Sequence, residues 1–267
     1  MINRGKRNVV GIFVDAVDYE AAEEIIFRAA YERRGAAVSA LAVHGVMTGV
    51  LNSEHKFRLN HFDLLVPDGQ PVRWVLNLLW DARLKDRVYG PSLTLKVCAR
   101  AAAEGVPLYF YGGTPEILRG LVDSLQTRFP GIRIAGAEPS KFRQLSIEEK
   151  NELELRIRAS GAQITLIGLG CPRQESFAYE FREGLSMPVF AVGAAFPFIA
   201  GVLPQAPPWM QRRGLEWLFR LISEPRRLWR RYLYLNPAYT ALALLQCLRL
   251  NTFSTTGVQP KVEERAG

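Results

Sequence analysis

An acidic residue follows one of the short apolar runs of this sequence, in a position suited to ligand binding. Asp68 stands in a Pro-Asp-Gly turn directly after the run FDLLV at residues 62–66, which reads as a buried strand. Open α/β sheets bind their ligands at the carboxyl ends of their strands. Asp68 is therefore a candidate ligand contact, and the alternative is an aspartate that caps the following helix.

Two glycine turns are candidate phosphate sites. Gly112 and Gly113 lie where the apolar run VPLYFY meets a predicted helix, so backbone N–H groups could bind a phosphate or a sugar hydroxyl there. A tight turn explains the pair equally well. The run IGLGCPRQE at 167–175 is richer, because it joins a glycine-rich turn to Gln174 and two charged neighbours. Neither turn has the GxGxxG or GxxxxGK[ST] spacing, which disfavours an NAD enzyme and a P-loop kinase.

The stretch 205–235 is strongly basic and aromatic. Its seven arginines and two glutamates give 7 − 2 = +5 of the chain's net charge of +8. Pro225 is expected to divide it into two short helices, with Ser223 as a plausible N-cap. In the first helix one apolar face is predicted, made by Leu215, Leu218, Phe219 and Ile222. Arg220, Arg227 and Arg230 then lie on the other side.

Three interpretations of this stretch remain open from its residues alone. It could be a terminal helical pair with solvated arginines, because charge runs are usually solvated faces. It could lie on a membrane, with aromatic side chains at the headgroups and each basic residue worth about 1 kcal/mol near anionic lipid. A basic, aromatic-laced stripe is also the expected footprint of nucleic-acid binding.

Composition limits the remaining possibilities. The 267 residues are 48% hydrophobic and 22% charged, which suffices for a substantial core. Three distant cysteines without a CxxC spacing indicate thiols in a reducing compartment. The sequence shows no signal peptide at its start and no apolar run of the ~18 to 20 residues that span a bilayer.

The predicted elements alternate between apolar strands and helices of 10 to 15 residues. This alternation predicts an α/β fold with a Rossmann-like, mostly parallel sheet and helices on both faces. We expect a catalytic domain over 1–203, a C-terminal helical appendage over 204–250 and a disordered tail over 251–267. The run Val9 to Val17 is rich in residues that favour β-structure. A last helix, Pro237 to Asn251, is nearly all apolar and could pack on the domain or enter a membrane interface.

Seven motifs in one order resemble the WecG/TagA/CpsF family of bacterial glycosyltransferases. The resemblance spans roughly Val9 to Leu235 and is carried by PDG, RVYG, FYGGTPE, IGLGCPRQE, VGAAFPFIAG, APPWMQRRGLEWLFRL and EPRRLWRRY. It implies transfer of a sugar from a UDP-sugar to a polyprenyl-diphosphate-linked acceptor in wall or surface polysaccharide assembly. It also implies no metal requirement and an appendage that docks on the membrane and closes the active site.

The resemblance also implies roles for individual residues. Asp68 matches the family's proposed catalytic base, which would deprotonate the acceptor hydroxyl. Arg87 matches an arginine near the substrate phosphates, and Gln174 matches a polar residue of the sugar-nucleotide pocket. The appendage arginines thought to reach toward the diphosphate correspond to Arg220, Arg227 and Arg230. A guanidinium suits that task because it stays charged and binds phosphate oxygens in a fork.

Several positions depart from the family pattern. The usual Thr-x-Asn after the second strand is represented by Ala42 and His44, and His44 could substitute as a polar contact. Pro197 replaces the acid of the usual FDF, Gln205 opens the usual RAP, and Ser92 stands where an aspartate is common. Such concerted changes favour a different sugar or acceptor, and an inactive member of the family is the alternative.

Two hypotheses from different classes follow. The first is an inverting, cofactor-independent hexosyltransferase that lies peripherally on the cytoplasmic face of the cell membrane. Its expected partners are a UDP-sugar donor, a lipid-linked saccharide acceptor, an anionic membrane surface and possibly a second copy of itself, but not nucleic acid. The second is a noncatalytic nucleotide-sugar or nucleic-acid binding protein built on the same fold.

Overall fold

A six-stranded parallel sheet forms the centre of the molecule. The computed structural model describes residues 1–260, apart from the side chains of Arg227 and Arg231. The strand order is β4-β3-β8-β7-β5-β6, and every pair in it is parallel. The strands are β3 (Ala36–Leu41), β4 (Leu64–Pro67), β5 (Leu108–Gly112), β6 (Ile134–Glu138), β7 (Ile164–Gly168) and β8 (Pro188–Ala191).

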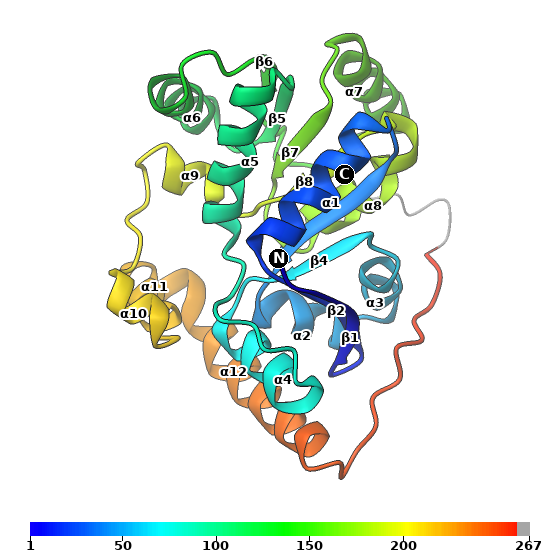
Figure 1. Cartoon of the computed structure of the whole chain (residues 1–267), viewed down its shortest axis with the longest axis vertical. Coiled ribbons are helices and arrows are strands. Elements are labelled where there is room, and N and C mark those ends of the chain that lie inside the picture. Colours follow the sequence, from blue (N-terminus) through cyan, green and yellow to red (C-terminus); the bar gives the residue numbers. More distant parts are fainter. Residues whose placement is uncertain (261–267) are drawn as a thin grey trace.

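Helices cover both faces of this sheet (Figure 1). One face buries apolar side chains from α1 (Tyr19–Tyr31), α5 (Gly90–Glu104), α6 (Pro115–Arg128) and α9 (Ala195–Ile199). The other face buries side chains from α2 (Val43–Leu51), α3 (Ser53–Asn60), α4 (Gln70–Trp80), α7 (Ile147–Ala159) and α8 (Arg173–Leu185). The central strands β7 and β8 are mostly apolar, as expected of strands buried on both faces. The predicted Rossmann-like α/β fold is confirmed.

The chain begins with a β-hairpin, and the β-rich run Val9 to Val17 supplies its turn and its second strand. Strand β1 (Asn3–Val9) pairs antiparallel with β2 (Ile12–Val17) across a two-residue turn. Both turn residues, Val10 and Gly11, have positive φ, as tight hairpin turns require. The sequence did not reveal β1, because this strand is charged and only its last residue is buried.

Three helices follow the sheet: α10 (Pro208–Arg212), α11 (Glu216–Ser223) and α12 (Pro225–Cys247). The predicted break at Pro225 is confirmed, but Glu224 is the N-cap of α12, and the Ser223 hydroxyl donates to the Phe219 carbonyl at 2.9 Å. The separate helix expected from Pro237 does not exist, because α12 continues through that proline. Buried Tyr239 and Ala243 pack against the core, and this packing offsets the roughly 3 kcal/mol that an internal proline costs.

The segment after α12 runs back over the body as an extended strand-like path (Figure 1). Two side-chain amides hold its carbonyls: Asn8 donates to Phe253 at 2.8 Å and Asn60 donates to Thr255 at 2.6 Å. The Val258 N–H donates to the Ser53 carbonyl at 3.1 Å. The expectation of disorder is therefore wrong for residues 251–260, because distant asparagines supply the partners that the local sequence lacks. Residues 261–267 of the predicted tail lie outside the described residues.

No helix within residues 1–260 combines the length and the apolar composition that crossing a bilayer requires.

Gln246 fastens the end of α12 to the hairpin turn. Its Oε1 accepts from the buried Val10 N–H at 2.8 Å, and its Nε2 donates to the Asn8 carbonyl at 3.1 Å. Replacing it by alanine leaves the Val10 N–H without a partner, so we expect Gln246→Ala to lower the free energy of unfolding by about 1 to 3 kcal/mol. Urea unfolding measures the change.

The matched control is Gln126→Ala, at an exposed position of α6. This control should change the stability by less than about 0.5 kcal/mol. Equal effects of the two substitutions would show that the Gln246 hydrogen bonds do not stabilise the docked helix.

Candidate active site

The candidate site residues gather at the carboxyl edge of the sheet. Asp68 follows β4, His44 lies in the first turn of α2 after β3, and the glycine pair ends β5. Gln174 lies in the first turn of α8, after β7. Parallel strands place these ends together, so the edge chosen from the sequence is the edge at which the residues meet.

Asp68 is held by the start of helix α5. Its Oδ1 accepts from the Gly90 N–H at 2.6 Å. Burial raises the pKa of its carboxyl to about 6, and the charge of Glu216 adds to this, while Arg87, the Gly90 N–H and Arg220 act in the opposite direction. The aspartate thus caps a helix, but that helix is α5 and not the one that follows it. Its pKa lies close to neutral pH, as a proton acceptor requires.

Arg87 connects Asp68 to the C-terminal helices. Its Nη1 donates to the Asp68 backbone carbonyl at 3.1 Å, and its Nη2 forms a 2.5 Å ion pair with Glu216 of α11. The guanidinium also stacks over the Tyr89 ring at 4.2 Å and approaches Gln211 Oε1 at 3.4 Å. The side chains of Arg87 and Glu216 are only 8% and 13% exposed. A largely desolvated ion pair therefore joins the sheet edge to the appendage.

Gln174 is fixed by two hydrogen bonds within its own turn. Its Oε1 accepts from the Gly170 N–H at 3.1 Å, and its Nε2 donates to Glu175 Oε1 at 2.8 Å. Glu175 Oε1 also accepts from the Ser39 hydroxyl at 3.1 Å. Burial raises the pKa of Glu175 above its ordinary value. The amide is thus oriented by a buried acid behind it.

The end of β8 bridges Asp68 and Gln174. A Cβ placed on Gly90 would lie 3.5 Å from Asp68 Oδ1 and 3.8 Å from the Val192 carbonyl oxygen. The next residue, Gly193, is so close to Gln174 that its Cβ would lie 3.5 Å from that Nε2. Asp68 and Gln174 therefore lie close to the same short segment, Val192 and Gly193. Gly90 and Gly193 have no side chains, which allows this close approach.

The glycine pair serves the close approach of two strands. Gly112 has a φ of +120°, and a Cβ there would lie 2.7 Å from the carbonyl carbon of Gly168. The Gly113 N–H donates to the Gly168 carbonyl at 3.2 Å. This N–H is therefore committed to a protein partner, which favours the tight-turn interpretation for Gly113. Contact of either glycine with a substrate stays a prediction.

Four helices that begin at this edge receive no hydrogen bond from the side chain of their own N-cap residue. They are α2, α4, α5 and α8, whose N-cap residues are Ala42, Gly69, Tyr89 and Pro172. Asp68 caps α5 instead, through the Gly90 N–H. Thr114 caps α6 at the same edge, and Asp18, Asn52 and Ser146 cap α1, α3 and α7. A helix N-terminus carries partial positive charge and unsatisfied N–H groups, so it attracts anions. The arrangement at this edge suits an anionic ligand.

The appendage arginines do not all reach the site. Arg220 stacks over the Phe198 ring at 5.7 Å and is close enough to lower the pKa of Asp68. Arg230 is exposed and stacks over Trp229 at 5.2 Å, away from these contacts. The side chain of Arg227 lies outside the described residues. Of the three predicted arginines, only Arg220 is seen to act on Asp68.

A comparison with known protein families identifies the family of this chain. Residues 7–252 match the glycosyl transferase WecG/TagA/CpsF family. The chain belongs to this family. The match covers nearly the whole described chain, including α10, α11 and α12, and so the appendage is part of the family's shared architecture. The resemblance carried by the seven sequence motifs is confirmed.

Three residues that contact Arg87 do not stand out as site residues in the sequence. They are Tyr89, Gln211 and Glu216. The signal for Glu216 was available, because it is the acid within the GLEWL motif of a strongly basic stretch. Its partner Arg87 lies 129 residues away, which no local pattern reveals.

Glu216 is expected to tune the Asp68 carboxyl. Glu216→Gln removes a negative charge near Asp68 and leaves the positive charge of Arg87 to stabilise the Asp68 carboxylate. We therefore expect the Asp68 pKa to fall from about 6 toward its ordinary value of 3.8. Carbon-13 NMR of carboxyl-labelled aspartate, followed with pH and assigned with Asp68→Asn, measures both values.

Glu183→Gln is the control, because Glu183 is 86% exposed on α8 and should leave the Asp68 pKa unchanged. Because the pKa of Asp68 is raised in the folded protein, its protonated carboxyl contributes to stability. This contribution is fully present below about pH 4 and is lost as the pH rises through 6. An Asp68 pKa of 4 or lower in the wild type, or one that Glu216→Gln does not move, would contradict this reading.

Proposed function

We propose that this protein transfers a sugar from a UDP-sugar to a polyprenyl-diphosphate-linked acceptor in the assembly of a cell-surface polysaccharide. Family membership supports sugar transfer for cell-surface polymer biosynthesis. The observation that carries the finer proposal is the environment of Asp68. This carboxyl has a pKa of about 6 and lies beside two arginines and the N-termini of α2, α4, α5 and α8, whose own N-cap side chains form no cap.

Asp68 is the general base of the proposed reaction. The Gly90 N–H occupies Oδ1, which leaves Oδ2 to take the proton from the acceptor hydroxyl. That hydroxyl oxygen attacks the anomeric carbon as the bond to the UDP oxygen breaks, and the configuration at this carbon inverts. A base whose pKa lies near the working pH is most effective, because it is both ionised and able to hold a proton.

Arginines and helix N-termini stabilise the leaving diphosphate. Arg220 lies over Phe198 at the same edge, and Arg87 is held in place by Tyr89 and Glu216. Guanidinium groups and oriented N–H groups act on charge that develops as UDP departs. Gln174, oriented by Glu175, is the proposed contact for the sugar nucleotide, and His44 is a further polar contact at the start of α2.

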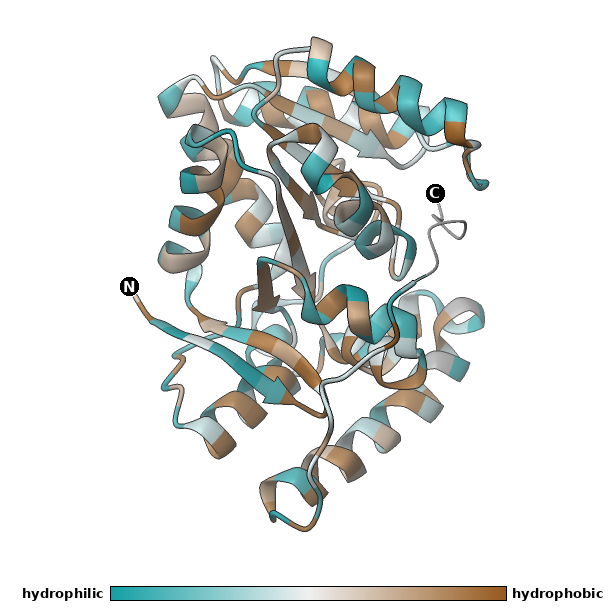
Figure 2. Ribbon diagram, turned by 90° about the vertical axis from the view of Figure 1, so that its right-hand side faces the viewer, coloured by the Kyte–Doolittle hydropathy of each residue, from teal (hydrophilic) through white to brown (hydrophobic). Residues whose placement is uncertain are grey.

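The appendage is the proposed membrane contact, and the cytoplasmic face of the membrane is the proposed location. In α12, exposed Leu233 and Leu244 project from a different side of the helix than buried Leu228, Tyr239 and Ala243. Leu233 of α12 is 61% exposed, and Ile222 of α11 is 71% exposed. Figure 2 shows hydrophobic residues along the helices at the end of the molecule where α12 lies. Exposed Arg226 and Arg230 add the cationic component that an anionic surface attracts.

Removing the proposed base should abolish turnover without unfolding the protein. We expect Asp68→Asn to lower the rate of acceptor-dependent UDP release by about 10²- to 10⁴-fold, the usual contribution of general base catalysis. UDP release is measured with a set of UDP-sugars and a polyprenyl-diphosphate saccharide, and thermal unfolding checks the fold.

Asp81→Asn is the matched control, since Asp81 is exposed at the C-terminal end of α4 and should leave the rate unchanged. Full activity in Asp68→Asn would remove Asp68 from the mechanism. Absence of UDP release from every donor, together with steeply salt-dependent binding to duplex DNA, would favour the noncatalytic alternative.

The exposed face of the appendage should govern membrane binding. The double variant Ile222→Asn with Leu233→Asn removes two apolar side chains from the proposed interface, so we expect it to lower the fraction that co-sediments with anionic phospholipid vesicles by about tenfold. Leu155→Asn on α7 is the control, because Leu155 is 63% exposed at the far end of the molecule (Figure 1). Equal binding of the two variants would contradict the proposed surface.

A further inference from the structure

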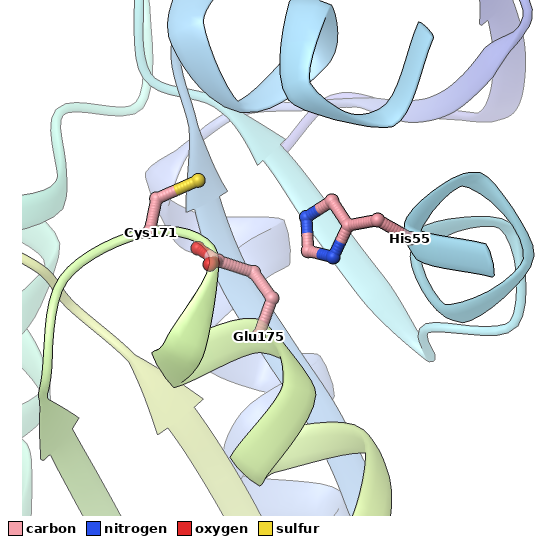
Figure 3. Close-up of side chains that lie close together, drawn as sticks. All are labelled: His55, Cys171 and Glu175. Carbon is pink, nitrogen blue, oxygen red and sulfur yellow. The ribbon is translucent and has the colours of Figure 1, made fainter. Parts of the chain in front are cut away.

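Three side chains that bind metals in proteins meet in the interior between α3 and α8. His55 comes from α3, Glu175 from α8, and Cys171 from the turn between β7 and α8. One ligand atom from each lies within 4.8 Å of the other two. Figure 3 shows the three side chains close together, with the imidazole facing the thiol and the carboxylate, which lie beside each other.

Two of these side chains are buried, and one of them has an atom without a hydrogen-bond partner. His55 is 3% exposed and Glu175 is 1% exposed. His55 Nε2 has no partner in the described part of the chain, and the Cys171 thiol is a hydrogen-bond partner of the Glu175 carboxylate. A buried polar atom without a partner is unfavourable, because it has lost its hydrogen bonds to water. An unpartnered imidazole nitrogen beside a thiol–carboxylate pair indicates a bound group that the three side chains share.

We propose that His55, Cys171 and Glu175 bind a divalent transition-metal ion of the zinc class. Thiolate, imidazole and carboxylate together form a donor set that zinc accepts and that magnesium and calcium do not prefer. Zinc bonds of about 2.0 to 2.3 Å place tetrahedral ligand atoms about 3.4 to 3.8 Å apart, so a contraction of about 1 Å completes the site. The fourth position is left for water.

The surroundings hold the carboxylate in the orientation that a ligand needs. Glu175 Oε1 accepts hydrogen bonds from Gln174 Nε2 at 2.8 Å and from Ser39 Oγ at 3.1 Å. These bonds leave Oε2 for the metal, and outer hydrogen bonds of this kind are typical of metal-binding carboxylates. Through Gln174 the ion would also brace the proposed sugar-nucleotide contact.

The local charge permits a dication. Arg58 lies near His55 and opposes a cation, and its own partner is Glu54 at 3.9 Å. A divalent ion bound to one thiolate and one carboxylate forms a neutral unit once the thiol proton is released, so the occupied site carries no net positive charge that would repel Arg58. The ion would join α3 to the start of α8, which predicts a structural role and not contact with the reacting sugar.

Cobalt and zinc titrations of the full-length, tag-free protein test this site. After chelator treatment we expect about one zinc ion per chain to bind and to raise the melting temperature. Cobalt should give the near-ultraviolet thiolate charge-transfer band. Cys171→Ser should abolish that band and weaken zinc binding by about 100-fold or more, and His55→Gln should weaken it to a similar extent.

Cys247→Ser and His61→Gln are the matched controls, because Cys247 lies on α12 and His61 is exposed after α3. Both should keep the band and the affinity. Failure of the wild type to bind zinc, a band that survives in Cys171→Ser, or loss of binding in either control would overturn the proposal. If Cys171→Ser does not fold, the zinc affinity of His55→Gln alone tests the proposal. None of these readouts requires sugar transfer, so the site can fail while the proposed function stands.

Discussion

The ion pair between Arg87 and Glu216 is the contact on which the arrangement of this edge depends. It joins the loop before α5 to α11 in a largely desolvated position. Removing one partner of such a pair typically costs about 3 to 5 kcal/mol, because the other charge stays buried alone. The pair therefore fixes the appendage over the sheet edge, and with it the position of Arg220. Asp68 owes part of its raised pKa to the same closure, because burial is the largest cause of the shift.

The helix N-termini at the same edge also favour a negatively charged ligand. At this edge the N-cap side chains of α2, α4, α5 and α8 form no cap, whereas Thr114 caps α6. Leaving these N–H groups without side-chain partners is unfavourable unless a ligand or water satisfies them. Asp68 takes one of them, the Gly90 N–H, and so the acid and the anion-binding groups share one network. A nucleotide-sugar diphosphate would supply both an anomeric carbon for attack by a hydroxyl and the negative charge that this network suits.

Local sequence patterns predicted much of this molecule. Apolar runs and intervening helices gave the parallel sheet, and the turn residues placed Asp68 and Gln174 at its carboxyl edge. The patterns failed where a distant partner decides the outcome. Glu216 acquires its role from Arg87, the segment 251–260 from Asn8 and Asn60, and the continuity of α12 through Pro237 from the burial of Tyr239. Such pairings depend on tertiary contacts that no short window of sequence contains.

The dependence of sugar-transfer rate on pH tests the central claim most directly. If Asp68 accepts the proton in a site closed by the Arg87–Glu216 pair, kcat/KM should rise with a slope of one up to an inflection at about pH 6 and then level off. The same inflection should move to lower pH in Glu216→Gln. A rate that is flat between about pH 5 and 8, or an inflection that Glu216→Gln leaves in place, would contradict the account.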